Sequence, residues 1–337
     1  MTPATPRLSV LLPYRNAAPT LDEALRSVLS EREVPLEVLA VDDGSQDDGP
    51  ERVRARARDD PRVRPLTTQG VGIARALNLA VEGARAPLLA RMDADDVSLP
   101  GRFPRQVAML EGDPSLGAVG TRVEAFPAGA VGGGLARYVR WQNGLVTPAD
   151  HDRDLFVESP LCHPSVAIRR RAMDAVGGYH EGPFPEDYDL WLRLHAAGWR
   201  LAKVPQVLLR WRHESGRMTF QDPRFAPERF RELKARHLAP RLHAIGRPVT
   251  LWGAGPTGRR LGRALEAHGI RAQRFVDIDP RKIGGHARGV PIVAPERLRK
   301  GTELILVAVG ARGARKLIRN ALDARGFVEL EDYICAA

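Results

Sequence analysis

The sequence predicts an α/β protein in which a domain with a mostly parallel sheet is followed by a second, smaller α/β domain. From Leu8 to Leu110, short apolar runs alternate with helical patterns, which is the order that builds parallel sheets. Acidic residues follow two of these apolar runs, at Asp42 and Asp93. Another strand, glycine-rich turn and helix are predicted from Val249 onward. At 337 residues the chain is long enough to form two hydrophobic cores.

The first elements follow from apolar spacing and helix-boundary residues. Leu8–Leu12 is a short apolar run that predicts a strand. The segment Thr20–Glu23 has the pattern of a capping box, so we expect a helix to begin there. Pro35 interrupts the helical spacing, and Leu36–Val41 predicts a second strand. The same reasoning gives the next expected elements, which are 62–66 extended, 70–84 helical, 87–91 extended and 102–110 helical.

An acidic turn follows the second predicted strand. Asp42 and Asp43 stand directly before Gly44. Open α/β sheets bind ligands at the carboxyl ends of their strands, where a carboxylate can accept hydrogen bonds from a nucleobase N–H or a ribose hydroxyl. The alternative is a turn in which Asp and Gly supply only the required backbone geometry.

Three carboxylates follow a later apolar run, at Asp93, Asp95 and Asp96. Side chains alternate in an extended chain, so we expect Asp93 and Asp95 to share one cation and Asp96 to face away. Carboxylates that leave coordination positions open suit Mg²⁺ or Mn²⁺ together with a substrate phosphate. The alternatives are a solvated turn or a helix cap, and Arg91 could pair with these carboxylates.

Several ordered motifs resemble the family 2 glycosyltransferases, which have the GT-A nucleotide-sugar fold. The resemblance spans about residues 7–220, and the motifs together are more specific than any one alone. They are Ser9–Asn16, Val41–Ser45, Asp93–Asp95, Pro185–Arg193 and, similar to the family's late histidine motif, Trp211–His213. The resemblance implies an inverting, metal-dependent transferase that moves a sugar from a nucleotide-sugar donor, uridine-linked, to an acceptor hydroxyl. Surface polysaccharide or glycoconjugate synthesis is the expected setting.

Transfer with inversion requires a base for the acceptor hydroxyl and a positive centre for the leaving nucleoside diphosphate. By the resemblance, Asp187 is the general base, and the N-terminus of an amphipathic helix would hold it in place. Glu186 competes for that role and otherwise belongs to the acceptor side, whereas Asp189 is expected to be structural. His163 resembles a segment that lines the acceptor side, and its alternative is an ordinary loop residue.

The resemblance assigns the cation, Mn²⁺ or Mg²⁺, to Asp95 first, with His213 in reach of the metal or the diphosphate. A single histidine equally suits a core or surface position, because it provides no ligand spacing. Arg75 could cap a phosphate or a base. The expected nucleotide-sugar contacts are Pro13, Arg15, Asp42, Asp43, Arg75 and Asp93.

The C-terminal part has a glycine pattern in its proper context. The strand Val249–Trp252 precedes Gly253, Gly255 and Gly258, and Asp277 ends the next strand roughly 20 residues later. This pattern resembles a Rossmann-type nucleotide-binding half and predicts a dinucleotide site, unless the glycines only make a tight turn. About ninety residues remain and no tyrosine–lysine pair is recognisable, which favours a binding or docking module.

The expected domains are residues 1–222 for the glycosyltransferase domain, 223–246 for a helical linker and 247–337 for the Rossmann-like domain. The last of these carries 17 Lys/Arg and 9 Asp/Glu, within a chain total of 51 and 41. Such an excess would suit anionic lipid, a phosphorylated acceptor or an acidic partner, or would be ordinary solvated surface. Aromatic residues are not interleaved with these basic residues, so we do not expect a nucleic-acid partner.

The cysteine content and the N-terminal segment favour the cytoplasm. Cys162 and Cys335 make no disulfide framework, and the N-terminus has no apolar signal-peptide region. No apolar stretch approaches the roughly 20 residues needed to cross a bilayer, so any membrane contact would be peripheral, at the inner face. The expected partners are a nucleotide-sugar donor and a saccharide or lipid-linked acceptor.

Two other functions stay open on the sequence alone. A nucleotide-sugar oxidoreductase or epimerase, or another NAD-binding protein, would act through the C-terminal domain. A non-catalytic binding protein would contain a degenerate transferase domain. The presence of Asp93, Asp95 and Asp187 argues against the second alternative, because loss of function commonly removes such acids.

Overall fold

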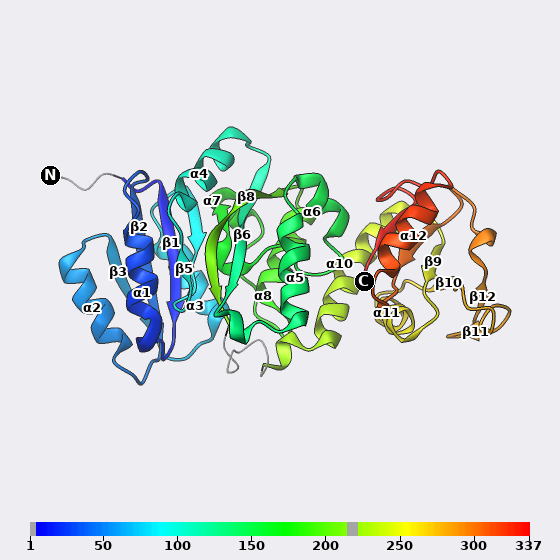
Figure 1. The fold of residues 1–337 in the computed structure, drawn as a ribbon, viewed down its shortest axis with the longest axis horizontal. Coiled ribbons are helices and arrows are strands. Elements are labelled where there is room, and N and C mark those ends of the chain that lie inside the picture. The colour runs from blue at the N-terminus through cyan, green and yellow to red at the C-terminus, as the bar shows by residue number, and fades with distance from the viewer. Residues whose placement is uncertain (1–4, 214–221) are drawn as a thin grey trace. The chain divides into compact units, whose positions relative to one another are not determined.

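A computed structural model describes residues 5–213 and 222–337. The chain divides into two compact units, each built around its own sheet (Figure 1). Unit 1 comprises Met1–Asp152, Pro160–Gly182 and Glu186–Asp222, and unit 2 comprises Arg153–Ser159, Pro183–Pro185 and Pro223–Ala337. The helix before the second sheet therefore belongs to unit 2, together with two short segments from earlier in the sequence.

The sheet of unit 1 has eight strands in the order β3-β2-β1-β4-β7-β6-β8-β5. Strands β3, β2, β1 and β4 run parallel to one another, β6 and β8 are parallel, and β7 is antiparallel to both of its neighbours. This mostly parallel sheet confirms the predicted fold class. The strands are β1 Leu8–Tyr14, β2 Leu36–Asp43, β3 Val63–Thr68, β4 Leu88–Arg91, β5 Val97–Ser98, β6 Leu116–Phe126, β7 Ala167–Arg169 and β8 Arg200–Arg212.

The helices of unit 1 form where apolar residues recur at helical spacing. In α1, for example, Leu21, Leu25 and Val28 are fully buried on one face. The helices are α1 Ala18–Leu29, α2 Gly49–Asp59, α3 Ile73–Gly83, α4 Arg102–Gly112, α5 Gly133–Gly144, α6 Pro148–Asp154, α7 Arg170–Ala175 and α8 Glu186–Ala196. Helix α6 ends two residues beyond the boundary of unit 1. Short 3₁₀ helices are η1 Ala128–Ala130 and η2 His163–Ser165.

The predicted capping box of the first helix is wrong. Helix α1 begins at Ala18, so Thr20 lies inside its first turn instead of before it. The Ala18 backbone N–H donates to an Asp47 carboxylate oxygen at 2.8 Å, and Thr20 donates its hydroxyl hydrogen to the Ala94 carbonyl at 2.9 Å. Pro19 fits the first turn because the backbone N–H that it lacks would have no intrahelical partner there. An acceptor distant in sequence therefore replaces the local cap.

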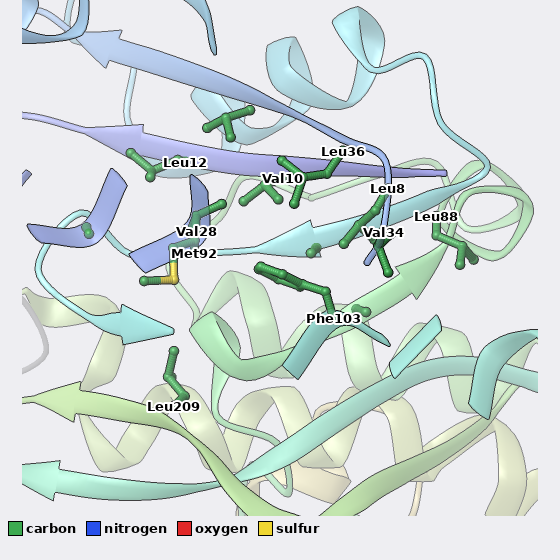
Figure 2. Close-up of a cluster of buried hydrophobic side chains, with 14 of the residues drawn as sticks. Leu8, Val10, Leu12, Val28, Val34, Leu36, Leu88, Met92, Phe103 and Leu209 are labelled. Atoms are coloured by element: carbon green, nitrogen blue, oxygen red, sulfur yellow. The ribbon is translucent and has the colours of Figure 1, made fainter. Parts of the chain in front are cut away.

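The core of unit 1 joins the strands that carry the acidic turns. Val10 of β1, Val28 of α1, Phe103 of α4 and Leu209 of β8 belong to one buried cluster, together with Met92 after β4. Figure 2 shows how Val10, Met92 and Phe103 lie within this cluster. Each such side chain stabilises the folded state by about 1.5–3 kcal/mol when it is fully buried. The cluster also includes Ala40 of β2 and Ala90 of β4, so packing anchors both strands that lead into the acidic turns.

Unit 2 contains a six-stranded sheet in the order β11-β12-β10-β9-β13-β14, which confirms the predicted second α/β domain. All neighbouring strands are parallel except β11 and β12. The order reverses at β9, between β10 and β13, which makes this edge a topological switch point. The strands are β9 Val249–Trp252, β10 Ala272–Val276, β11 His286–Ala287, β12 Val290–Val293, β13 Leu304–Val307 and β14 Tyr333–Cys335.

The helices of unit 2 are α10 Pro227–Ile245, α11 Pro256–Glu266 and α12 Ala314–Asp323, with short 3₁₀ helices η3 Pro223–Phe225 and η4 Pro295–Arg297. Helix α10 ends at Ile245 and is capped by Gly246, whose φ of +67° is the left-handed conformation that glycine adopts readily. Across both described ranges, no helix combines the length and the apolar character that a membrane crossing requires.

Candidate active site

Three carboxylates gather in the turn that follows β4. Asp93, Asp95 and Asp96 each offer an oxygen within 4.8 Å of the other two. The chain turns after Met92 instead of remaining extended, and the Asp96 backbone N–H donates to the Asp93 carbonyl at 3.4 Å. The expectation that Asp96 faces away is therefore wrong, because side-chain alternation applies only to extended backbone. Three hard oxygen donors in one turn fit Mn²⁺ or Mg²⁺.

Arg91 is the nearest cation to this acidic turn along the chain. It is the last residue of β4, its side chain is 3% exposed, and its guanidinium forms an ion pair with Asp93. This confirms the interpretation that Arg91 pairs with the acidic motif. The guanidinium lies beneath the turn and offsets part of the repulsion among its carboxylates.

Arg212 lies within the predicted Trp211–His213 motif, although no role was predicted for it, and it connects the end of β8 to the same turn. Its backbone N–H donates to Asp96 Oδ1 at 2.7 Å, and its Nε donates to the Asp95 carbonyl at 2.6 Å. Its guanidinium also pairs with Glu23 at 2.5 Å and lies 4.5 Å from the centre of the Phe126 ring. These contacts fix the main chain of the turn from the side of β8.

His213 follows Arg212 directly, but its ring does not join the three carboxylates. Its backbone N–H donates to the Phe126 carbonyl at 2.7 Å, and its ring meets Trp211 edge-on at 6.3 Å. Among the residues that the structure describes, the close acidic group consists of Asp93, Asp95 and Asp96 without His213. A metal or diphosphate role for His213 stays a prediction.

Asp187 lies in the first turn of α8, half-buried beside the buried Glu186. Burial raises the pKa of Asp187 to about 7, and the negative charge of Glu186 adds to the rise. A hydrogen bond from the Tyr188 backbone N–H at 2.7 Å opposes the rise without cancelling it. A carboxylate with a pKa near neutral can both accept and release a proton at physiological pH, which is the property of a general base.

Asp189, expected to be structural, forms an ion pair within α8. Its Oδ2 accepts a hydrogen bond from Arg193 Nε at 2.6 Å, and the His180 ring lies 3.7 Å away. This ion pair spans one turn of α8 and satisfies a buried carboxylate. The structural interpretation of Asp189 is confirmed.

His163 lies in η2 as a buried residue instead of an exposed loop residue. Its Nε2 is 3.0 Å from the Tyr179 hydroxyl oxygen, and its ring meets Trp191 edge-on at 6.0 Å. Burial lowers the pKa of His163 well below its usual range, and the positive charge of Arg91 lowers it further. His163 is therefore neutral, and its role on the acceptor side stays a prediction.

The guanidinium of Arg91 lies within electrostatic range of both parts of this site. Its charge opposes the rise in the pKa of Asp187 that burial and Glu186 cause. It also opposes the burial-driven rise in the pKa of Tyr179, the hydrogen-bond partner of His163. The carboxylate turn after β4 and the start of α8 are thus neighbours of one buried cation.

The acidic turn after β2 is held by internal hydrogen bonds. Asp43 accepts hydrogen bonds from the backbone N–H groups of Val71 at 2.7 Å and Gly72 at 2.9 Å. Asp42 Oδ1 accepts one from the Ser45 backbone N–H at 3.0 Å. Burial acts to raise the pKa of Asp43, but these and other hydrogen bonds lower it overall. Both acids shape turns here, and their contacts with a nucleoside stay predictions.

The other expected nucleotide contacts lie around the carboxyl ends of β1 and β2. Pro13 is buried in β1 opposite Val41. Arg15 is exposed after β1, with its Nη1 only 3.7 Å from where a Cβ on Gly70 would lie. Arg75 is exposed on α3 and pairs with Glu181 at 2.6 Å. Binding of a phosphate or base by Arg75 requires this pair to open, and nucleotide contacts of Pro13 and Arg15 stay predictions.

The glycine turn of unit 2 is closely packed at two of its three glycines. A Cβ on Gly253, whose φ is +127°, would lie 2.6 Å from the Ala308 carbonyl oxygen, and one on Gly258 would lie 1.9 Å from the Gly253 carbonyl oxygen. Nothing lies within 4 Å of the corresponding position on Gly255. Tight packing explains Gly253 and Gly258, and open space remains at Gly255.

Asp277 at the end of β10 already has several hydrogen-bond donors. Its Oδ2 accepts from the Ala254 backbone N–H at 3.1 Å and from Lys282 Nζ at 3.0 Å, and its Oδ1 accepts from the Asp279 backbone N–H at 3.0 Å. The Asp277 carboxylate therefore stabilises the glycine turn through its hydrogen bond with Ala254.

The first unit is a transferase domain of the GT-A type: a mostly parallel sheet carries a carboxylate turn for a cation, and a candidate base lies at the start of a nearby helix. The family model for "Glycosyl transferase family 2" matches residues 9–177. The chain belongs to this family and is a glycosyltransferase, which confirms the resemblance seen in the sequence.

Curated relatives and a solved structure agree with this membership. The amylovoran biosynthesis glycosyltransferase AmsE of Erwinia amylovora is 30% identical over 195 residues, covering 57% of this chain and 70% of the relative. The UDP-Gal:alpha-D-GlcNAc-diphosphoundecaprenol beta-1,3-galactosyltransferase of Escherichia coli is 28% identical over 212 residues, covering 62% and 75%. The crystal structure of S. aureus TarS 1-349 has a similar fold, with a TM-score of 0.55 and 15% identity, covering 78% and 71%.

Proposed function

We propose that this glycosyltransferase moves a sugar from a uridine-linked nucleotide sugar to an acceptor hydroxyl with inversion, using Mn²⁺ or Mg²⁺. The observation that carries the proposal is the combination of a three-carboxylate turn with a separate carboxyl group whose pKa is about 7. The first can hold a cation, and the second can hold a proton. Direct displacement at an anomeric carbon requires both functions.

Each function falls to particular residues. Asp95, with Asp93 and Asp96 beside it, holds the cation, which when bound supplies positive charge for the leaving diphosphate. Asp187 accepts the proton of the acceptor hydroxyl as that oxygen attacks the anomeric carbon and the bond to the diphosphate breaks. Burial, together with the charge of Glu186, raises the pKa of Asp187 to about 7, so the base is strong enough to act near neutral pH.

The donor and acceptor classes rest on similarity. One relative is named for a UDP-Gal donor and a diphosphoundecaprenol-linked acceptor, and another for amylovoran biosynthesis. The TarS fold, at a TM-score of 0.55, has been solved in complex with UDP-GlcNAc. These names support a UDP-linked donor, a saccharide or lipid-linked acceptor, and a role in polysaccharide or glycoconjugate synthesis.

Unit 2 would place such an enzyme at the cytoplasmic face of a membrane. The support is the surplus of 17 Lys/Arg over 9 Asp/Glu in residues 247–337, because basic surfaces are attracted to anionic lipid headgroups. Co-sedimentation with anionic vesicles, reversed by high salt and absent with neutral vesicles, is the expected result. Equal binding to both kinds of vesicle, or binding to neither, would contradict peripheral attachment by charge.

The proposal also includes a second cofactor, a dinucleotide bound by unit 2. The switch point between β10 and β13, the tight packing at Gly253 and Gly258 and the open space at Gly255 fit a diphosphate at the start of α11. The ribose position fits less well, because Asp277 is already hydrogen-bonded to Ala254 and Lys282. Calorimetric titration with NAD⁺ tests this: saturable binding would support it, and absence of heat up to millimolar ligand would refute it.

Nucleoside diphosphate release from a panel of nucleotide sugars, with Mn²⁺ or with a chelator, tests the main proposal. We expect release from a UDP-sugar in the presence of Mn²⁺ and its loss with the chelator. Asp174→Asn is a suitable control, because Asp174 is an exposed acid that pairs with Arg170 outside the site. Release that is independent of metal, or confined to donors with another base, would contradict the corresponding part of the proposal.

A further inference from the structure

Arg91 combines deep burial with a position at the end of β4, directly before the acidic turn in the chain. Its backbone N–H donates to the Val166 carbonyl at 2.8 Å, and its own carbonyl accepts a hydrogen bond from Arg102 Nη2 at 2.7 Å. Arg91 therefore has its main chain fixed on both sides at the end of β4. The side chain, 3% exposed, starts from a rigid point and has little room to move.

The positive charge of the Arg91 guanidinium is compensated by an ion pair with Asp93. Arg91 Nη1 forms an ion pair with Asp93 Oδ1, and within residues 5–213 and 222–337 neither Nη1 nor Nε of Arg91 makes a hydrogen bond. A buried guanidinium is destabilised by several kcal/mol unless a counter-ion compensates it. The pair therefore restrains Asp93, whose side chain is 26% exposed and would otherwise rotate more freely.

A carboxylate has two oxygens, and the ion pair engages one of them. The ion pair with Arg91 is made by Oδ1, so Oδ2 is the Asp93 oxygen that this pair leaves for a ligand, and a carboxylate oxygen of Asp93 lies within 4.8 Å of one from Asp95 and one from Asp96. Metal-binding carboxylates are commonly oriented by such a second contact, and its loss typically lowers metal affinity by about 10–100-fold. A guanidinium suits this role because its charge does not depend on pH in the working range.

We propose that Arg91 is a positioning residue that holds Asp93 Oδ1 and so directs Asp93 Oδ2 toward the cation. This inference rests on the proposed metal-dependent transfer and adds a residue that does not itself touch the cation. It also gives a direction of effect: removal of Arg91 weakens cation binding, although it removes a positive charge that would repel the cation. Charge repulsion alone would predict tighter cation binding after the removal of Arg91.

Mn²⁺ binding to the full chain tests the proposal without turnover, first with Mn²⁺ alone and then with UDP present. We expect Arg91→Met to bind Mn²⁺ about 10–100-fold more weakly than the wild type and Arg91→Lys to retain part of the affinity. Arg64→Met is the matched control, because Arg64 forms a 2.6 Å ion pair with the buried Glu37 elsewhere in the sheet. The control should bind Mn²⁺ as the wild type does.

Unchanged or tighter Mn²⁺ binding by folded Arg91→Met would overturn the inference while leaving the metal site intact. Absence of Mn²⁺ binding by the wild type, with and without UDP, would overturn the proposed metal dependence together with it. If Arg91→Met fails to fold, Arg91→Lys decides, and failure of both while Arg64→Met folds would show that Arg91 is only structural. In turnover, we expect a higher half-saturating Mn²⁺ concentration with the KM for the acceptor unchanged.

Discussion

The rate of sugar transfer should depend on the protonation of Asp187. Burial raises the pKa of this carboxyl from 3.8 to about 7, and the charge of Glu186 contributes to the rise. A protonated carboxyl cannot accept the acceptor's proton, so kcat/KM should increase with pH through this region. With a pKa near 7, about one tenth of the base is ionised at pH 6 and about nine tenths at pH 8, so the rate should change roughly tenfold.

The substitution Glu186→Gln isolates the contribution of the neighbouring charge. Glutamine keeps the size of the side chain and removes its negative charge, so the pKa of Asp187 should fall. Since burial is the larger cause and is retained, we expect the rising limb of kcat/KM to move by about one pH unit toward acid. Asp187→Asn should show no such limb and should lose about 10²–10⁴-fold in rate.

The assay is the initial rate of nucleoside diphosphate release at saturating Mn²⁺, measured from about pH 5.5 to about pH 8.5. Glu111→Gln serves as the control, because Glu111 is an exposed carboxyl that pairs with Arg7. Its profile should coincide with that of the wild type. A wild-type kcat/KM that is flat over this pH range, or a limb that Glu186→Gln leaves in place, would refute the assignment of Asp187 as a base whose pKa is raised by burial and by Glu186.

Further predictions concern unit 2. Gly258→Ala should lower the free energy of unfolding by about 1–3 kcal/mol or more, because its Cβ would lie 1.9 Å from the Gly253 carbonyl oxygen. Gly255→Ala should be tolerated, because nothing lies within 4 Å of its Cβ position. Equal melting temperatures of the two variants would contradict this packing. Glu303→Gln should destabilise by about 3–5 kcal/mol, because it leaves Arg274 without its buried counter-ion. Burial acts to raise the pKa of Glu303, but its hydrogen bonds lower this pKa overall. The stabilisation by the ionised Glu303 should therefore be present at neutral pH and disappear on acidification. If urea titrations show the same difference in stability between wild type and variant at neutral and at low pH, this explanation is wrong.

Local patterns were sufficient to predict most of the architecture. The strand β9 runs over Val249–Trp252 as expected, since a short apolar run bounded by Pro248 and Gly253 has few other conformations. The alternation of strands and helices gave the sheet of unit 1 for the same reason. The capping box at Thr20 failed because Asp47 supplies the acceptor for the start of α1 from another loop.

The site was harder to predict because its geometry depends on contacts distant in sequence. Asp96 joins the carboxylate group because the chain turns, and Arg212, 116 residues later, holds it there. No spacing rule links these two residues. From the sequence, His163 could equally be an ordinary loop residue. Its burial depends on contacts with Tyr179 and Trp191, which are distant in sequence. Motifs gave the residue types, and tertiary packing decides their orientation.

The proposed roles of Asp95 in cation binding and of Asp187 as the base are tested most directly by measuring Mn²⁺-dependent UDP binding and UDP release for Asp95→Ala and Asp187→Asn in parallel. We expect Asp95→Ala to lose Mn²⁺-dependent UDP binding and release together. We expect Asp187→Asn to bind UDP and Mn²⁺ as the wild type does, yet to release UDP from the donor about 10²–10⁴-fold more slowly. Wild-type turnover by Asp187→Asn, or undiminished Mn²⁺-dependent UDP binding by Asp95→Ala, would contradict the proposed cation site and base.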